Sequence, residues 1–511
     1  MKMQQSINNL EDRAAPIEMK PDDFRAAGHH LIDAIADFLT SLPERPVGPG
    51  ESPNEVRRVL GDSSIPEQGT SPHQLLDEAA NLMFEHSLFN GHPRFWGYIT
   101  SSAAPISALA DLLASAVNPN VGAWSISPVA SEIEAQTVKW IAELIGYPSD
   151  CGGLLVSGGN TANFVGFLAA RRIKLGQEVR TKGMRNVDGG QPIVYCSAET
   201  HTWIEKAADQ FGIGTNAIEW IPTNEKLQMD VDALRMQIEK DKTSGYKPFL
   251  VVGTGGSTGV GAIDPLPGIA EICGEHDLWF HVDGAYGGFA ATLPDAPSDL
   301  RGLSQADSIA IDPHKWMYSA LEAGCILVRD PANLIDTFSY HPTYYKFEET
   351  AEEAPVNFYE YGPQNSRGFR ALKVWLGIRQ VGRQGHLRMI AEDIQLAEHL
   401  YRIVDEHPEL EAFTQNLSIS TFRYVPSNLI GDRKEAEEYL NKLNEELLTK
   451  LQNSGKAFIS NAVVGEKYLL RSCIVNFRTS LEDVKALPDI VTRLGNEVDA
   501  ALRPDNLKTE E

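Results

Sequence analysis

The sequence predicts an α/β protein with a mostly parallel, doubly wound sheet in a large domain, followed by a small α+β C-terminal domain. Three observations support this. From Leu154 onward, short β-type runs alternate with helical stretches such as Val231–Lys240, the pattern of strands joined by helical crossovers. Later β-type runs instead flank the helical stretch Lys434–Leu451, as in an α+β unit. The length of 511 residues also favours two or three structural units.

Each strand of the large domain is predicted from a short apolar run bounded by turn residues. These runs are Ile193–Cys196, Ile218–Ile221, Phe249–Val252, Leu278–Val282, Ile309–Ile311 and Cys325–Val328. In the C-terminal part the β-type runs are Leu417–Tyr424 and Leu469–Phe477. Parallel sheets of this kind bind ligands at the carboxyl ends of their strands, so functional residues are expected there.

The predicted domains follow the chain. Residues 1–20 form a disordered tail, and residues 21–100 a helical N-terminal segment that opens at Pro21 and continues around Gln74 to Phe84. Its apolar stripe needs a surface to cover, either on the rest of the chain or on a second subunit. Residues 101–380 form the large domain, and residues 381–511 the small domain.

Composition excludes several functions. The formal net charge of −25 argues against nucleic acid or an anionic membrane as partner. The five cysteines are scattered, which disfavours disulfides and a zinc site and favours the reducing cytoplasm. The N-terminus has no apolar signal-peptide core, and no stretch approaches the roughly 18 uncharged apolar residues of a membrane helix.

One lysine stands at the end of a predicted buried strand. The run Ile309–Ile311 ends at Asp312, Pro313 stops the strand, and Lys315 follows between a histidine and a tryptophan. A partly desolvated amine is a good nucleophile for an aldehyde, with which it forms a Schiff base. The alternative is a lysine that only extends its stem along Trp316 toward solvent.

Three other strand ends carry residues that suit a phosphorylated aromatic ring. The small residues of Leu154–Ala162 lead into the helix Asn163–Arg172, and amides at such a helix start can hold a phosphate. His201 follows the strand at 193–196, where it could stack on a flat ring or be an ordinary surface histidine. Asp283 ends the run Leu278–Val282, where it could pair with a protonated pyridine nitrogen or cap a helix.

The segment Gly253–Gly259 contains G-x-S-x-G, the signature of a hydrolase nucleophile elbow. Val260–Pro265 follows it and is poor helix-forming sequence, which argues against an elbow. The spacing also fails the dinucleotide fingerprint G-x-G-x-x-G. Thr258 is instead expected to place its hydroxyl near the ring.

With these motifs in this order, the chain resembles the pyridoxal-phosphate-dependent group II amino acid decarboxylases from about Phe24 to about Thr479. The motifs that carry the resemblance are Asp312–Trp316, His281–Ala285, His92–Phe95 and Ser366–Lys373. The resemblance implies the cofactor pyridoxal 5'-phosphate (PLP), the PLP-dependent fold type I, and a homodimer with active sites at the subunit interface. It also implies that the N-terminal segment packs on the partner subunit.

The resemblance also implies a role for each residue. Lys315 would form the internal aldimine, Asp283 would pair with the pyridine nitrogen, and His201 and Ala285 would pack on opposite faces of the ring. The phosphate would be held by Gly159, Asn160 and His314. Asn160 stands where relatives often carry serine.

A long irregular segment, about 341–366, is the expected lid that excludes water. The family uses a lid tyrosine as proton donor, and counting back from Arg370 without gaps places Phe358 there, with Tyr359 beside it. Some plant relatives with phenylalanine at that position are oxidative aldehyde synthases. The product therefore stays open between an amine and an aldehyde.

The expected substrate is an aromatic L-amino acid, with an acidic one as the alternative. The aromatic loop Phe89–Tyr98 either lines a pocket for a flat ligand or forms core at a subunit contact. The candidate substrate-binding residues are Phe95, Trp96, Tyr98 and Ser101. An aminotransferase, another lyase of the same fold, and a PLP-binding protein without turnover are the less favoured alternatives.

Overall fold

The computed structural model describes residues 15–62, 64–340, 355–430 and 432–507. Most of the expected tail and residues 341–354 of the expected lid lie outside the described residues. The chain divides into two compact units: residues up to Phe89 together with 453–455, and the remainder.

The first unit is helical. Its elements are α2 (Pro21–Ser41), the short helix Leu42–Glu44, α3 (Pro53–Leu60) and α4 (Pro72–Glu85). Proline begins α2, α3 and α4, where its missing N–H costs no hydrogen bond. Helices α2 and α4 pack together through Phe38 and Phe84, whose rings stack at 4.4 Å. The two helical stretches predicted for this region are therefore present, as α2 and α4.

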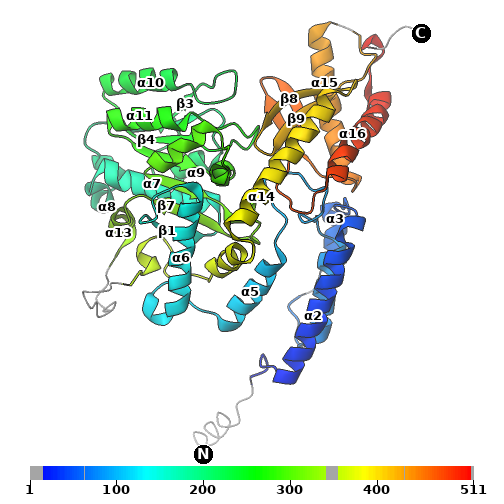
Figure 1. The fold of residues 1–511 in the computed structure, drawn as a ribbon, viewed down its shortest axis with the longest axis horizontal. Coiled ribbons are helices and arrows are strands. Elements are labelled where there is room, and N and C mark those ends of the chain that lie inside the picture. Colours follow the sequence, from blue (N-terminus) through cyan, green and yellow to red (C-terminus); the bar gives the residue numbers. More distant parts are fainter. Residues whose placement is uncertain (1–14, 63, 341–354, 431, 508–511) are drawn as a thin grey trace, which may run out of the picture. The chain divides into compact units, whose positions relative to one another are not determined.

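The second unit contains a seven-stranded sheet with the order β1-β7-β6-β5-β4-β2-β3. Its strands β1, β3, β4 and β7 are labelled in Figure 1. Strands β6, β5, β4, β2 and β3 are parallel, and β7 runs antiparallel to both β1 and β6. The strands are β1 (Gly152–Val156), β2 (Pro192–Ser197), β3 (Ile218–Ile221), β4 (Lys247–Thr254), β5 (Trp279–Asp283), β6 (Ser308–Ile311) and β7 (Gly324–Val328). The predicted mostly parallel, doubly wound sheet of an α/β protein is confirmed.

Helices cover this sheet, and five of its strands are buried along their whole length. Burial on both faces explains why they read as continuous apolar runs. Helix α7 packs across β4 to β7, and α10 and α11 pack on β4. The α-helices here are α5 (Pro105–Val117), α6 (Pro128–Ile145), α7 (Gly159–Leu175), α8 (Glu178–Lys182), α9 (Trp203–Gln210), α10 (Val231–Thr243), α11 (Leu266–His276), α12 (Pro313–Trp316) and α13 (Ala332–Phe338).

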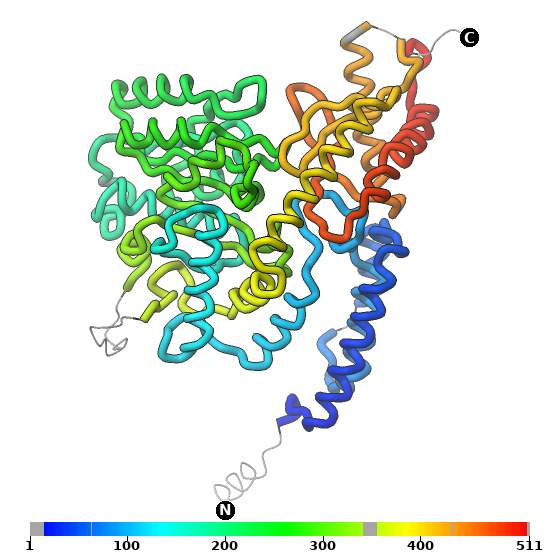
Figure 2. The backbone as a smooth tube through the Cα atoms, in the orientation of Figure 1, coloured from blue at the N-terminus to red at the C-terminus, as the bar shows by residue number. Residues whose placement is uncertain are grey.

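A second, antiparallel sheet has the order β10-β11-β9-β8. Its strands are β8 (Leu410–Asn416), β9 (Ile419–Tyr424), β10 (Ser460–Val464) and β11 (Lys467–Cys473), with helices α14 (Ala371–Asp405), α15 (Arg433–Asn453) and α16 (Leu481–Leu502). Helix α14 contacts α5 and α6 near one end and β8 and β9 near the other, so it joins the two sheets, as the backbone trace shows (Figure 2). It is interrupted at Gly382, which has a φ of 64°.

Several elements were not predicted, among them α5, β8, β10 and α16. The predicted run Leu417–Tyr424 is the second strand of a hairpin, because Leu417 adopts a φ of 48° and turns the chain before β9. The predicted run Leu469–Phe477 ends early, at Cys473. All five cysteines are free thiols. Among the described helices, none has both the length and the apolar character needed to cross a membrane.

Candidate active site

A cavity of about 380 Å³ opens at the carboxyl ends of the parallel strands. Thr254, Asp283 and Asp312 end or follow β4, β5 and β6, and all three face this cavity. Strands β10 and β11 of the second sheet contribute to the opposite wall. Of the predicted site residues, the lining includes Tyr98, Gly159, Asn160, His201, Thr258, Asp283, Ala285 and Lys315.

Lys315 lies in the single turn of α12, directly after β6. Its Nζ is 3.1 Å from Oδ2 of Asp312, which is almost fully buried. Oδ1 of Asp312 has no hydrogen-bond partner among the described residues. The turn is fixed from behind, because the Ser101 hydroxyl donates to the carbonyl of His314 at 2.7 Å. Lys315 is therefore held at the cavity with its amine near a buried carboxylate.

The start of α7 is shaped by glycine. Gly158 has a φ of 149°, and a Cβ added at Gly159 would lie 2.6 Å from Asp312 Oδ2 and 3.0 Å from the Ala285 methyl group. The N-terminal amides of this 17-residue helix therefore open onto the cavity with no side chain over Gly159. Such a helix start favours an anionic group.

His314 is not among the cavity-lining residues, although it lies beside this turn. Its Nδ1–H donates to the carbonyl of Ala323 at 2.7 Å, and a Cβ added at Gly158 would meet its ring at 3.5 Å. Burial, its largest influence, lowers the pKa of His314 from its ordinary value. The imidazole is therefore neutral near pH 7.

Asp283 ends β5 and is held on one carboxylate oxygen. Its Oδ2 accepts hydrogen bonds from Asn163 Nδ2 at 3.0 Å and from Trp203 Nε1 at 2.8 Å. Among the described residues, its Oδ1 accepts only the longer bond from the Ala285 N–H, at 3.2 Å. The carboxylate thus keeps acceptor capacity for a donor in the cavity.

His201 also lines the cavity. The backbone N–H of Trp203 donates to its Nδ1 at 3.3 Å, which leaves the proton on Nε2. Burial lowers the pKa of His201 from its ordinary value of 6.5, and the positive charge of Lys315 acts in the same direction. A neutral, fixed imidazole is suited to stacking on a flat ring.

Arg471 reaches the cavity from β11, although its side chain is almost fully buried. Its Nη1 donates to the Tyr98 carbonyl and to Ser460 Oγ, at 3.0 and 2.8 Å. Its Nε and Nη2 are buried and have no partner among the described residues. A buried guanidinium with free donors is costly unless a ligand supplies acceptors.

Two predicted substrate-binding residues lie elsewhere. Phe95 is 2% exposed and stacks on Phe458 at 5.2 Å. Trp96 is 1% exposed and belongs to the core formed by α14, α15, α16 and the second sheet. Both side chains therefore pack inside this chain rather than at the cavity. Tyr98, with a φ of 52°, does face the cavity, whereas Ser101 acts on the backbone of His314.

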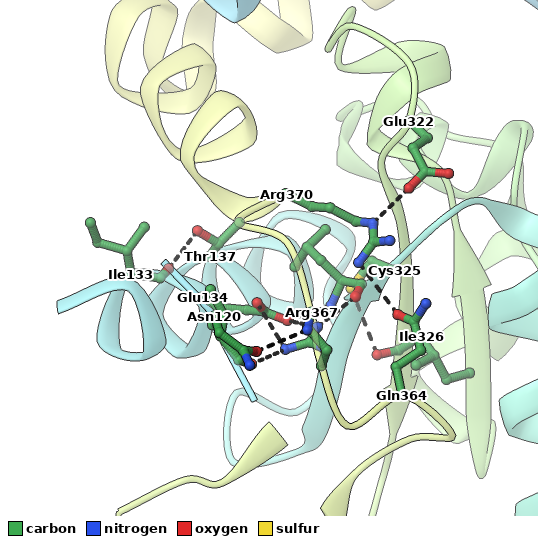
Figure 3. A network of polar contacts seen from close by, with 12 residues as sticks. Asn120, Ile133, Glu134, Thr137, Glu322, Cys325, Ile326, Gln364, Arg367 and Arg370 are labelled. Carbon is green, nitrogen blue, oxygen red and sulfur yellow. Dashed lines mark hydrogen bonds and ion pairs between the residues drawn. The ribbon is translucent and has the colours of Figure 1, made fainter. Parts of the chain in front are cut away.

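Phe358 and Tyr359 are also buried rather than part of the cavity wall. Phe358 is 1% exposed beneath the guanidinium of Arg367, 4.9 Å from its ring centre, and the Tyr359 N–H donates to the Gly122 carbonyl. Arg367 forms a fully buried ion pair with Glu134 (Figure 3). The gapless count from Arg370 therefore reaches the core, not a lid.

Several cavity residues were not predicted as site residues from the sequence: Thr100, Asn163, Thr254, Asp312, Ser460, Asn461 and Arg471. Two of them had a detectable signal. Asn163 lies on α7 one turn beyond Asn160, so both share the face that begins at the glycine turn. Arg471 interrupts an apolar strand, and a charge in such a run indicates a buried partner or ligand.

Known proteins share this architecture. The model of the pyridoxal-dependent decarboxylase conserved domain matches residues 53–425. The aromatic-L-amino-acid decarboxylase of Bacillus atrophaeus is 33% identical over 483 residues, which cover 94% of this chain and 97% of that protein. The phenylacetaldehyde synthase of Petunia hybrida is 29% identical over 469 residues, 89% of this chain and 91% of that protein.

The crystal structure of Oryza sativa TDC with PLP and tryptamine superposes with a TM-score of 0.86 at 26% identity, covering 95% of this chain and 99% of that one. The fold is therefore the PLP-dependent fold type I. Family and fold agree with the lysine, aspartate and helix start that meet at the cavity. The chain belongs to the pyridoxal-dependent decarboxylase family and is a PLP-dependent carboxy-lyase.

Proposed function

We propose that this protein decarboxylates aromatic L-amino acids to amines, with PLP bound through Lys315. The observation that carries the proposal is the convergence of Lys315, Asp283 and His201 with the glycine turn of α7 on one cavity. The positive charge of Arg471 at the same cavity would attract a carboxylate.

The residues present fit the cofactor. The helix start at Gly159 and Asn160 would hold its phosphate, and Lys315 would bind its aldehyde. Asp283 would face the ring nitrogen with the oxygen that has spare acceptor capacity. Bound in this way, PLP supplies a protonated ring that withdraws electrons from the substrate Cα.

The protein's own side chains orient the substrate. His201 is held neutral and would lie against one face of the ring, opposite Ala285. Arg471 would attract the substrate carboxylate with its positive charge, which would help to hold the bond to be broken in a fixed direction. Because Arg471 also donates to the Tyr98 carbonyl, carboxylate binding and the position of the Tyr98 loop would be linked.

The charges in the cavity support an aromatic substrate. Within the described lining, Lys315 and Arg471 are the only lysine and arginine. Once they engage the cofactor and the α-carboxylate, no basic side chain remains there for a second carboxylate. Tyr98 and Ile99 line the cavity and suit a flat apolar group. An acidic amino acid is therefore the less favoured substrate.

We further propose that the protein acts as a homodimer in the cytoplasm. Helix α5 presents an exposed apolar surface formed by Leu109, Leu112, Leu113 and Val117, each at least half exposed. A contiguous apolar row of this kind is typical of a subunit contact. The free state of all five cysteines supports a reducing compartment.

Oxidative conversion to an aldehyde is the second candidate, because a phenylacetaldehyde synthase is among the relatives. Phe358, which raised this possibility, lies in the core and does not favour it. Residues 341–354, which hold most of the expected lid, lie outside the described residues.

One experiment separates these outcomes. PLP-loaded protein is incubated with L-tyrosine, L-tryptophan, L-phenylalanine and L-glutamate while CO2, amine, aldehyde and oxygen are followed together. The proposal predicts CO2 with an equal amount of amine from an aromatic substrate and no oxygen uptake. Aldehyde with oxygen consumption would establish the second candidate. Turnover of glutamate alone would refute the aromatic specificity.

A further inference from the structure

A chain of hydrogen bonds runs from the buried residue Trp279 to Asp283 and reaches the cavity wall at Asn163. It begins at Trp279, passes through Ser308, His281 and Asn163, and ends at Asp283. The successive donor–acceptor distances are 2.8, 2.7, 2.8 and 3.0 Å. Both Ser308 and His281 have no exposed surface, so water does not compete for these bonds.

The direction of each bond is determined by chemistry. An ionised carboxylate only accepts, so Asn163 must turn its NH2 group toward Asp283 and its oxygen toward His281. That oxygen needs a donor, which places the proton of the imidazole on Nε2. Nδ1 must then accept, and the Ser308 hydroxyl donates to it while receiving the indole N–H of Trp279. Every bond therefore points toward Asp283.

Two further features adapt the structure to this imidazole. Gly166 lies on α7 over the ring, and a Cβ added there would be 2.7 Å from His281 Nδ1 and Cε1. The Trp203 ring meets the imidazole edge to face at 5.7 Å while its own N–H donates to Asp283. Burial lowers the pKa of His281 to about 4, so the ring stays neutral and keeps one donor and one acceptor.

We infer that His281 is a positioning residue for the cofactor ring nitrogen: its Nε2–H orients the Asn163 amide, which in turn holds the Asp283 carboxylate directed into the cavity. This inference rests on the proposed pairing of Asp283 with that nitrogen. In this arrangement Oδ2 of Asp283 accepts from Asn163 and Trp203, which leaves Oδ1 as the better free acceptor. A hydrogen-bond chain that is satisfied at every member also resists rotation of the carboxylate.

Two substitutions of His281 distinguish loss of the Nε2–H donor from loss of the imidazole ring as such. In His281→Gln the side-chain amide nitrogen lies near the position of Nε2 and can still donate to Asn163. In His281→Asn the shorter amide lies near Nδ1 and reaches only Ser308. We expect His281→Asn to weaken PLP binding to the apoenzyme about tenfold, the size of one lost hydrogen bond in a buried site. His281→Gln is expected to stay within about threefold of the parent.

The absorption spectrum of the loaded enzyme between pH 6 and 9 is the second readout, because it reports protonation of the cofactor and is insensitive to a loss of general stability. His281→Asn should change its pH dependence, and His281→Gln should not. His386 is another buried histidine, and it takes no part in this series of hydrogen bonds. His386→Asn is therefore the matched control and should alter neither readout. Equal behaviour of the Asn and Gln variants of His281 would overturn the inference.

Two more variants keep the test decisive. Asn163→Asp replaces the donor to Asp283 by a carboxylate oxygen, and two facing carboxylates cannot both stay ionised. It should weaken PLP binding at least as much as His281→Asn, and unchanged binding would overturn the inference. Asp283→Asn tests the proposed function on its own. If that variant leaves affinity and spectrum unchanged, the pairing of Asp283 with the ring nitrogen is wrong. If it changes both while His281→Asn changes neither, only the role of His281 fails.

Discussion

Glu134 and Arg367 enclose the backbone of Leu155 with a fully buried ion pair. Oε1 of Glu134 accepts the Leu155 N–H at 2.8 Å, and Arg367 Nη2 donates to the Leu155 carbonyl at 2.7 Å. Leu155 lies in β1, which leads directly to the glycine turn at the start of α7. The pair therefore supplies the backbone hydrogen bonds that a further strand would make at the outer edge of β1. Through the contact of Arg367 with the Phe358 ring, it also connects the segment around Phe358 to β1.

Loss of one member of this pair should be strongly destabilising. Glu134→Gln leaves the Arg367 guanidinium buried without a counter-charge, and we expect it to lower the free energy of unfolding by roughly 3–5 kcal/mol. Urea unfolding of the apoenzyme measures this loss. The control is Glu392→Gln, which removes the partner of Arg388 in an exposed pair and should cost less than about 1 kcal/mol. Similar losses in both variants would contradict the assigned role.

The sequence was sufficient for the sheet and for the residues at its strand ends. Buried strands give continuous apolar runs, and Asp283, His201 and Lys315 follow such runs closely, so their meeting at one edge is a consequence of parallel topology. The sequence was not sufficient for Arg471, which reaches the cavity from a separate sheet. No local period relates residues 471 and 315, and the two share a cavity only because elements of both sheets line it.

The aromatic loop shows the opposite limit. Phe95 and Trp96 are adjacent, and Tyr98 follows after a single glycine. Hydrophobicity alone cannot show which of these three rings faces the cavity. The backbone decides: Gly97 packs so closely on Phe458 that an added Cβ would lie 2.5 Å from its ring, and Tyr98 then takes a φ of 52°. This turn buries the first two rings and presents only Tyr98 to the cavity.

Substitution of Arg471 should separate substrate recognition from cofactor binding. Arg471→Gln removes the charge that would bind the α-carboxylate, and we expect kcat/KM to fall roughly 100-fold, as for a lost charge-assisted hydrogen bond. PLP affinity should change little. Ser460→Ala is the control, because it removes a structural partner of Arg471 and keeps the cation. An equal loss of kcat/KM in the control, or loss of PLP from Arg471→Gln, would show that Arg471 only supports the fold.

A charge on the apolar surface of α5 should disrupt the proposed dimer. Leu113 is 54% exposed, and Leu109 and Val117 lie one turn away on either side. Leu113→Glu would place a carboxylate in the contact, so we expect sedimentation velocity to show a monomer. Met236→Glu on α10 is the control, since Met236 is 65% exposed and outside this surface. A monomeric parent protein, or a dimeric Leu113→Glu variant, would refute a contact through α5.

Asp393 should make the stability of the apoenzyme depend on pH. The carboxylate lies on α14 and accepts hydrogen bonds on one oxygen from Trp316 Nε1 at 3.0 Å and the Tyr318 hydroxyl at 2.7 Å. Burial raises its pKa from 3.8 to about 7, although these two donors act in the opposite direction. Between about pH 4 and pH 7, Asp393 is therefore protonated in the folded state and ionised in the unfolded state. The stabilisation is complete at the acidic end of this range and is lost as the pH rises through about 7.

Asp393→Asn removes the titration and keeps an oxygen that can accept from Trp316 and Tyr318. Relative to the parent, the variant should be nearly equal in stability at pH 5 and more stable at pH 8, with a difference on the order of 3 kcal/mol at most. Thermal unfolding of the apoenzyme at both pH values measures this difference. Glu398→Gln, at an exposed carboxylate of the same helix, should leave the pH dependence unchanged. Parallel pH profiles for the parent and Asp393→Asn would show that Asp393 is ionised in both states, and that the turn carrying Lys315 is held by a permanent buried charge.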